Sequence, residues 1–144
     1  MTDPCNSPVK ILFVCVGNAC RSQMAEAWAN HFGGARVLAA SAGSHPYGSI
    51  VADTHQVMDE KRISLEGQFS KGLRAVNLAD MDVVVRMGRE VEVPLPADFK
   101  GRVVDWNVPD PYAQGMEPFR NVRDMIERQI LALLADVLVP DHPA

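Results

Sequence analysis

The sequence lacks a long hydrophobic run, has few cysteines and few aromatic residues, and carries no excess of positive charge. No apolar stretch approaches the roughly 20 residues that cross a bilayer, and no basic start precedes an apolar run, so we expect neither a membrane span nor an export signal. A formal net charge of −4 argues against general binding to nucleic acid or to a membrane surface, because both require a basic face. Any anion site must therefore be local.

Only three cysteines occur, Cys5, Cys15 and Cys20. The chain has 144 residues, 47% of them hydrophobic, and is large enough to fold around a core without disulfides. An odd number of thiols in such a chain is typical of a reducing compartment, so the sequence predicts a cytoplasmic protein with free thiols. Neither the cysteines nor the four histidines have the spacing of metal ligands, and no metal ion or other cofactor is expected.

The hydrophobic pattern predicts one domain over residues 9–139, with a flexible N-terminal arm at 1–8 and a C-terminal tail at 140–144. Short apolar runs rich in β-branched residues alternate with segments of helical period. The predicted strands cover 9–14, 37–40, 81–85 and 102–106. The predicted helices cover 22–32, 51–61 and 117–138, and the first of them begins at Ser22. This alternation indicates an α/β fold with a mostly parallel sheet and helices on both faces.

The loop from Cys15 to Ser22 joins the first strand to the first helix, which is where open parallel sheets commonly bind phosphate. Five residues separate Cys15 from Arg21, so successive backbone amides can point at one centre while the guanidinium covers the rim. Arginine suits this place because its planar fork donates two parallel hydrogen bonds to a tetrahedral oxyanion. These groups would favour a thiolate at Cys15, Ser22 could donate to that sulfur, and Asn18 could hold the strained turn.

The run Val14–Ser22 resembles the signature of the low-molecular-weight protein tyrosine phosphatase superfamily, which includes the thioredoxin-coupled arsenate reductases. The similarity continues through Ser41–Gly43 and Val108–Tyr112 to the last helix. The resemblance implies a four-stranded parallel twisted sheet of the phosphotyrosine protein phosphatase I type. It also implies that Cys15 forms a cysteinyl-phosphate intermediate and that Asp110, in the Asp-Pro pair, is the general acid and later the base. From the sequence alone, Asp110 also fits an ordinary turn.

The resemblance extends to the residues that would hold the substrate. Tyr47 and Tyr112 resemble the aromatic walls that sandwich a phosphotyrosine ring, and the alternative is that both are simply exposed loop tyrosines. Cys20 would form a reversible disulfide with an oxidised Cys15, or it merely fills space under the loop. The full set of expected substrate-binding residues is Val16, Gly17, Asn18, Ala19, Cys20, Ser22, Tyr47 and Tyr112.

The first functional prediction is a cysteine-dependent phosphatase acting on a phosphorylated protein or a small aryl phosphate. The alternative is an arsenate reductase, because the stretches Ser22–Trp28 and Gln68–Lys71 look more like that branch. Those reductases pass oxidising equivalents to further cysteines after the third strand, and the loop Met87–Pro96 has none. A reductase built on this chain would need an external thiol such as glutathione, mycothiol or a protein of the thioredoxin or glutaredoxin type. A third possibility is a non-catalytic oxyanion-binding module.

Overall fold

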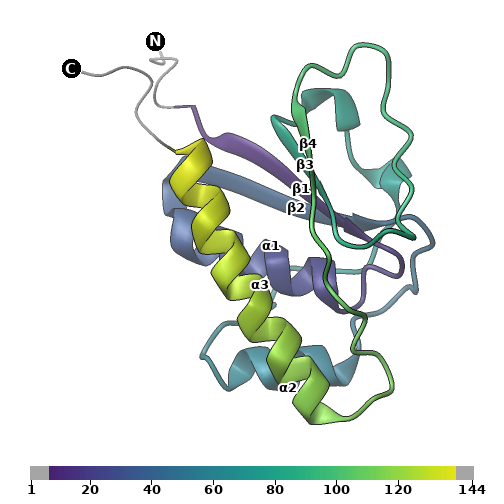
Figure 1. The fold of residues 1–144 in the computed structure, drawn as a ribbon, viewed down its shortest axis with the longest axis vertical. Helices are drawn as coiled ribbons and strands as arrows, with labels where there is room; N and C mark the ends of the chain where they lie inside the picture. Colours follow the sequence, from purple (N-terminus) through teal and green to yellow (C-terminus); the bar gives the residue numbers. More distant parts are fainter. Residues whose placement is uncertain (1–6, 139–144) are drawn as a thin grey trace.

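The computed structural model describes residues 7–138, so Cys5, residues 1–6 of the predicted arm and the predicted tail lie outside the described residues. Four strands form one parallel sheet in the order β2-β1-β3-β4 (Figure 1). The predicted α/β fold with a four-stranded parallel sheet is confirmed. The elements are β1 (Val9–Cys15), α1 (Arg21–Gly33), β2 (Val37–Gly43), α2 (Ala52–Asp59), β3 (Val83–Arg86), β4 (Arg102–Asp105) and α3 (Met116–Val137).

Strand β1 lies in the middle of the sheet and is buried on both faces. Ile11 and Phe13 belong to the cluster that packs under the helices, whereas Leu12 and Val14 belong to a second cluster on the opposite face. All four side chains are fully buried, as expected for an apolar strand between two neighbours in a parallel sheet. The burial of β1 fixes the position of Cys15, which is its last residue.

The two faces of the sheet are covered by different kinds of structure (Figure 1). The helices α1, α2 and α3 gather on one face, and α3 contacts both of the others. The other face is covered by the long loops around β3, which contain two short 3-10 helices at Leu73–Ala75 and Leu78–Asp80. Among the described helices, none combines the length and the apolar character required to cross a membrane.

Helix α2 is fastened to α3 by an ionic cluster around Glu60. The Glu60 carboxylate accepts hydrogen bonds from Arg120 at 2.9 Å and from Arg123 at 2.6 Å, and Arg123 also donates to the carbonyl of Val57 at 2.9 Å. The hydrogen bonds from Arg120 and Arg123 lower the pKa of Glu60 from 4.5 to about 2. Its ionised form is therefore favoured in the folded protein.

We expect this cluster to contribute to acid sensitivity. Because the folded pKa of Glu60 is depressed, its stabilising effect is complete above about pH 4.5 and is lost as the pH falls toward 2. Glu60→Gln should lower the melting temperature at pH 7 and flatten its decline between pH 5 and pH 3, as measured by thermal unfolding. The matched control is Glu117→Gln, because Glu117 is more exposed and contacts Arg120 alone. Equal pH profiles for the wild type and Glu60→Gln would contradict this role.

Candidate active site

Hydrogen bonds from the segment that follows β2 hold the loop between β1 and α1 in a curved conformation. The carbonyl oxygens of Cys15, Val16 and Gly17 accept bonds of 3.0, 2.8 and 2.8 Å from backbone amides of residues 44–47. In a trans peptide plane the carbonyl and the amide of the next residue point in opposite directions. The amides that follow these carbonyls therefore face the concave side of the loop, where an anion can be bound.

Gly43 makes this curl possible. A Cβ atom at Gly43 would lie 2.5 Å from the carbonyl oxygen of Val16 and 3.0 Å from the amide nitrogen of Asn18. Both contacts are with backbone, which cannot move aside as a side chain can. The end of β2 can therefore approach the loop this closely only because residue 43 has no side chain.

The concave side of the loop opens into a small cavity of about 120 Å³. Cys15 is 2% exposed and forms part of its wall. The structure thus brings together eight of the eleven predicted site residues around this cavity and adds Val51, which the sequence did not indicate. The lining residues are Cys15, Gly17, Ala19, Cys20, Arg21, Tyr47, Val51, Asp110 and Tyr112.

Three predicted loop residues lie behind this wall and do not line the cavity. Val16 packs against the apolar cluster on the far face of the sheet, whereas Asn18 and Ser22 are fully buried polar residues. Asn18 has a φ angle of 50°, so the predicted strained turn is present. Helix α1 begins at Arg21, with Cys20 at its N-cap and no side-chain cap, so Ser22 lies inside the first turn and does not begin the helix as predicted.

The hydroxyl of Ser22 does not cap the helix and lies within hydrogen-bond distance of Cys15. Asn18 donates from Nδ2 to Ser22 Oγ at 2.7 Å and to Ser41 Oγ at 2.9 Å, and its Oδ1 accepts from the amide of Lys71 at 2.8 Å. The amide orientation of Asn18 is therefore set, and Ser22 Oγ accepts one of its hydrogens. The hydroxyl hydrogen of Ser22 remains for Cys15 Sγ, which lies 2.9 Å away.

Removing this hydroxyl should slow the chemistry of Cys15. A hydrogen bond to a charged group contributes about 1.5 kcal/mol, so loss of the Ser22 donor to the attacking sulfur in Ser22→Ala should reduce the rate of Cys15 alkylation about tenfold. The measurement is the rate of iodoacetate incorporation at one fixed pH. The control is Ser44→Ala, which removes a neighbouring hydroxyl outside this network. An unchanged rate in Ser22→Ala would show that the sulfur does not use this hydrogen bond.

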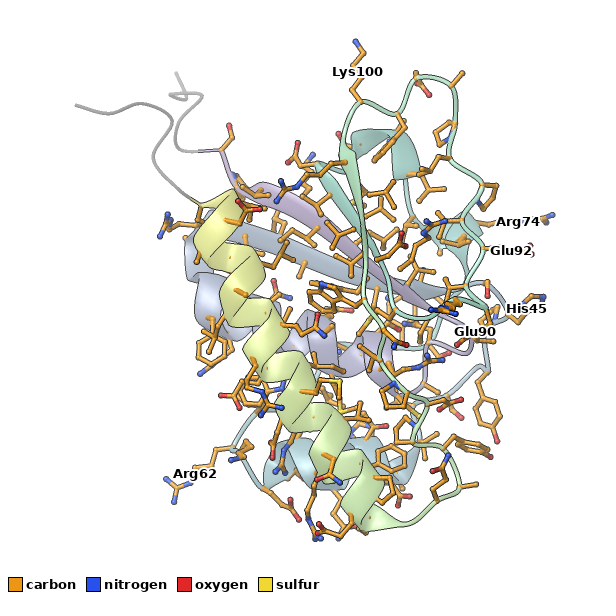
Figure 2. All side chains as sticks on the ribbon, in the orientation of Figure 1. His45, Arg62, Arg74, Glu90, Glu92 and Lys100 are labelled. Carbon is orange, nitrogen blue, oxygen red and sulfur yellow. The ribbon has the colours of Figure 1, made fainter. Side chains whose placement is uncertain are left out.

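Arg21 is buried beside the cavity and bound to the loops that follow β3 and β4. Its NH1 donates to the carbonyl oxygens of Met87 at 2.7 Å and Val108 at 3.1 Å, and to Glu90 Oε1 at 3.0 Å. Glu90 is labelled in Figure 2, at the same end of the sheet as His45. Arg21 is 3% exposed, so its charge is held in a water-poor setting that strengthens its attraction for an anion.

The mouth of the cavity is formed by Asp110 and by two tyrosines. Asp110 Oδ2 lies 4.0 Å from NH2 of Arg21, while its Oδ1 accepts the amide of Tyr112 at 3.0 Å. Asp110 therefore shapes a turn and also faces the cavity, so its position is compatible with both sequence-based interpretations, and its role as general acid stays a prediction. The hydroxyls of Tyr47 and Tyr112 are 3.1 Å apart and their rings meet edge to face at 5.9 Å. The mouth is therefore narrowed by a contact between its two walls.

The second cysteine of the loop differs from the first in its surroundings. Burial raises the pKa of the Cys20 thiol to about 12, and this effect outweighs the hydrogen bond with Thr54 and the charge of Arg21, which both lower it. Cys20 therefore stays protonated at neutral pH and is a poor nucleophile. Both Cys15 and Cys20 are free thiols in this structure.

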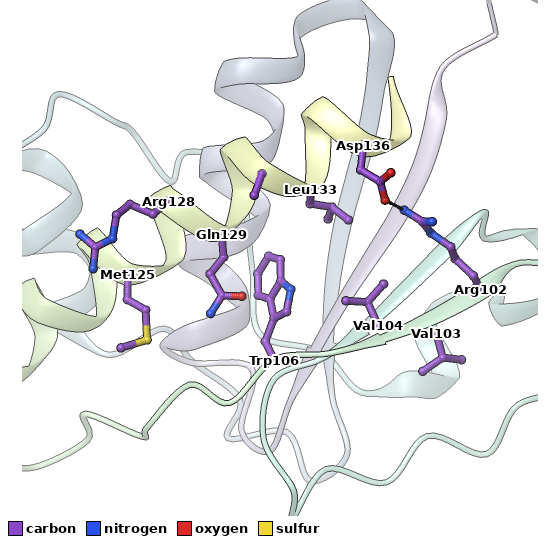
Figure 3. Close-up of a pocket in the computed structure, with 10 residues that line it drawn as sticks. Arg102, Val103, Val104, Trp106, Met125, Arg128, Gln129, Leu133 and Asp136 are labelled. Atoms are coloured by element: carbon purple, nitrogen blue, oxygen red, sulfur yellow. Dashed lines mark hydrogen bonds and ion pairs between the residues drawn. The ribbon is translucent and has the colours of Figure 1, made fainter. Parts of the chain in front are cut away.

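A larger cavity of about 670 Å³ lies between β4 and α3 (Figure 3). Its walls are Trp106, Met125, Leu133 and other side chains that carry no nucleophile, and its ion pair joins Arg102 to Asp136 at 2.5 Å. No cysteine, serine or histidine lines it. The chemistry-bearing residues predicted from the sequence thus gather in the smaller cavity.

Besides Val51, the sequence analysis missed Ser41 and Glu90 as contributors to the site. Ser41 was placed just after the second strand, although a polar residue beside a buried apolar strand was a usable signal for a buried hydrogen bond. Burial raises the pKa of Glu26, whose carboxylate accepts a hydrogen bond of 2.6 Å from Ser41. Glu90 gave no signal, because its partner Arg21 is 69 positions away in the chain.

Comparisons with known proteins agree with this geometry. The sequence model of the low molecular weight phosphotyrosine protein phosphatase family matches residues 10–139. The chain is 33% identical to the glutaredoxin arsenate reductase of Synechocystis sp., over 89% of this chain and 98% of that protein. A solved arsenate reductase in the phosphate-binding state superposes with a TM-score of 0.80 at 32% identity, over 90% and 98% of the two chains. A low molecular weight protein tyrosine phosphatase from T. tengcongensis superposes with a TM-score of 0.78 at 25% identity, over 89% and 99%.

Proposed function

Because the chain belongs to the low-molecular-weight phosphotyrosine protein phosphatase family, we propose that it is an arsenate reductase in which Cys15 is the nucleophile and an external thiol is the reductant. The observation that carries the proposal is the small oxyanion cavity that holds Cys15 and Arg21 and is narrowed by the Tyr47–Tyr112 contact. The sequence placed a phosphatase first and this activity second. The higher identity to proteins named arsenate reductase supports the reverse order.

The size of the cavity supports a small inorganic substrate. Its volume of about 120 Å³ is well below the roughly 300–1,000 Å³ of pockets that take drug-sized ligands. The cavity is therefore suited to a group of a few heavy atoms. That is the scale of a tetrahedral oxyanion such as arsenate or phosphate. A phosphotyrosine ring would have to separate Tyr47 from Tyr112.

The residues of the site supply a consistent first step. Arsenate is bound by the loop amides and Arg21, and the thiolate of Cys15 attacks arsenic to form a sulfur–arsenic bond. One arsenate oxygen leaves as water, and Asp110 at the mouth is placed to supply a proton to it. The product is an arsenate ester of Cys15 in which arsenic is still in its higher oxidation state.

Reduction then requires two electrons from thiols. An external thiolate attacks Cys15 Sγ, the sulfur–arsenic bond breaks with its electron pair going to arsenic, and arsenite leaves. A second thiol reduces the mixed disulfide and restores Cys15, so that two thiols become one disulfide for each arsenate reduced. Among the described residues the other cysteine is Cys20, which is protonated at neutral pH, and this supports a donor from outside the chain.

The proposal is tested by arsenite production from arsenate with three separate donors: glutathione with glutaredoxin, mycothiol, and thioredoxin with its reductase. We expect turnover with at least one of them, and unchanged turnover in Cys20→Ser and Cys5→Ser, because neither thiol resolves the intermediate. Loss of arsenite in Cys20→Ser, with phosphate affinity and thermal unfolding unchanged, would place the relay inside the chain. Absence of arsenite with every donor would contradict the proposal.

A second candidate, hydrolysis of aryl phosphates, is favoured by one observation. Asp110 and two tyrosines stand together at the mouth, which is the arrangement needed to protonate and flank an aromatic leaving group once the tyrosines separate. Hydrolysis of para-nitrophenyl phosphate without any thiol donor would support this activity. Tyr47→Phe, which removes the hydroxyl contact, should then lower KM for the aryl phosphate.

A further inference from the structure

Glu90 lies in the loop after β3 and touches the buried guanidinium from outside the cavity. We propose that Glu90 is a positioning residue that holds NH1 of Arg21 in place, so that the remaining nitrogens face a bound oxyanion. The inference rests on the proposed role of Arg21 in oxyanion binding. It names a residue that does not itself contact the substrate cavity.

The hydrogen bonds of NH1 leave it no capacity for an oxyanion. NH1 carries two hydrogens, and three acceptors surround it: the carbonyl oxygens of Met87 and Val108 and the carboxylate of Glu90. An oxyanion must therefore be bound through Nε and NH2. NH2 is the nitrogen that lies 4.0 Å from Asp110 at the mouth.

The carboxylate of Glu90 supplies a negative charge to the guanidinium of Arg21, which a third backbone carbonyl would not. The guanidinium is 3% exposed, and a buried charge is costly unless it is paired. Burial of Glu90 opposes its ionisation, but hydrogen bonds from its own backbone and from Arg21 lower its pKa, so it is ionised at neutral pH. Glu90 is thus the anionic partner of Arg21 when no oxyanion is bound.

The same carboxylate would also repel an oxyanion, so two effects oppose each other. The side chain of Glu90 is 52% exposed, and water and salt screen its charge toward a ligand in the cavity. Its hydrogen bond to NH1 is a direct contact at 3.0 Å. We therefore expect positioning to outweigh repulsion.

Gly88 gives the ion pair the space it needs. A Cβ atom at Gly88 would lie 2.6 Å from Glu90 Oε1 and 2.9 Å from NH1 of Arg21, and the φ angle of 156° is one that other residues rarely adopt. A side chain at position 88 would push the two partners apart. Gly88→Ala is therefore a second way to break the contact without removing the carboxylate.

The test compares three substitutions in one loop. Glu90→Ala should lower kcat/KM for arsenate about tenfold, partly through a higher KM, since loss of a charge-assisted hydrogen bond at a half-exposed site lies at the low end of its range. Glu90→Gln keeps an oxygen acceptor and should stay within about threefold of the wild type. Glu92→Ala removes the same charge from an exposed side chain two residues on and should change nothing.

Affinity for inorganic phosphate, measured by protection of Cys15 from iodoacetate, gives a readout that needs no turnover. Weaker protection in Glu90→Ala and in Gly88→Ala, restored in Glu90→Gln, supports the positioning role even if the wild type reduces no arsenate. Tighter phosphate binding in both Glu90 variants would show that repulsion dominates and would overturn the inference. Wild-type values in Glu90→Ala beside an active wild type would overturn it while leaving the proposed function intact.

Discussion

Cys15→Ser should abolish turnover of arsenate and of para-nitrophenyl phosphate, by at least about 10⁴-fold. A serine hydroxyl at this position has no general base to activate it, because its nearest partner, Ser22, is a hydroxyl 2.9 Å from the sulfur. The side chains of serine and cysteine are similar in size, so the loop and its amides should persist. Phosphate affinity, measured by isothermal titration calorimetry, should therefore be retained while turnover is lost.

The matched control for this experiment is Cys20→Ser. Cys20 lines the same cavity but is protonated at neutral pH, and its replacement should leave most of the activity. Loss of activity in both variants would point to a damaged loop, and thermal unfolding would reveal it. Substantial turnover in Cys15→Ser would remove this residue from the mechanism.

Asp110→Asn should lower turnover about 100-fold with little change in phosphate affinity. General acid catalysis by a positioned carboxylic acid contributes typically 10²–10⁴-fold, and an amide cannot donate a proton in its place. Asparagine keeps the side-chain oxygen that accepts the amide of Tyr112, so the turn is preserved. The drop in turnover can then be assigned to proton transfer.

The dependence on the leaving group makes this prediction sharper. Phenoxide needs protonation more than para-nitrophenoxide does, so Asp110→Asn should slow the hydrolysis of phenyl phosphate more than that of para-nitrophenyl phosphate. Glu92→Ala serves as the control for loss of one carboxylate on a nearby loop. An equal effect of Asp110→Asn on both esters would leave Asp110 as a turn residue only.

Much of the fold could be predicted because local pattern and tertiary environment agree. The apolar run at residues 9–14 is short and β-branched, and it is the central strand that is buried on both faces. The last helix has a continuous apolar stripe and was placed to within one residue at each end. These elements depend on burial, which the hydrophobic pattern records directly.

The errors arise where long-range contacts override local signals. Strand β2 was predicted to end at Ala40 because Ser41–Gly43 has the composition of a loop, yet it continues to Gly43. The hydroxyl of Ser41 is bound by Asn18, and Gly43 gives room for the loop after β1. Ser22 was assigned to a helix start because serine commonly caps helices, whereas its hydroxyl is used by Cys15. The local sequence pattern does not indicate either of these hydrogen-bond partners.

The most direct test of the central claim is peptide mapping after a brief reaction of the native protein with iodoacetate at neutral pH, with and without inorganic phosphate. If Cys15 is a thiolate in a cavity that also binds an oxyanion, iodoacetate should carboxymethylate Cys15 and not Cys20, and phosphate should prevent the labelling. Labelling of Cys20 before Cys15, or labelling of Cys15 that phosphate leaves unchanged, would contradict the account.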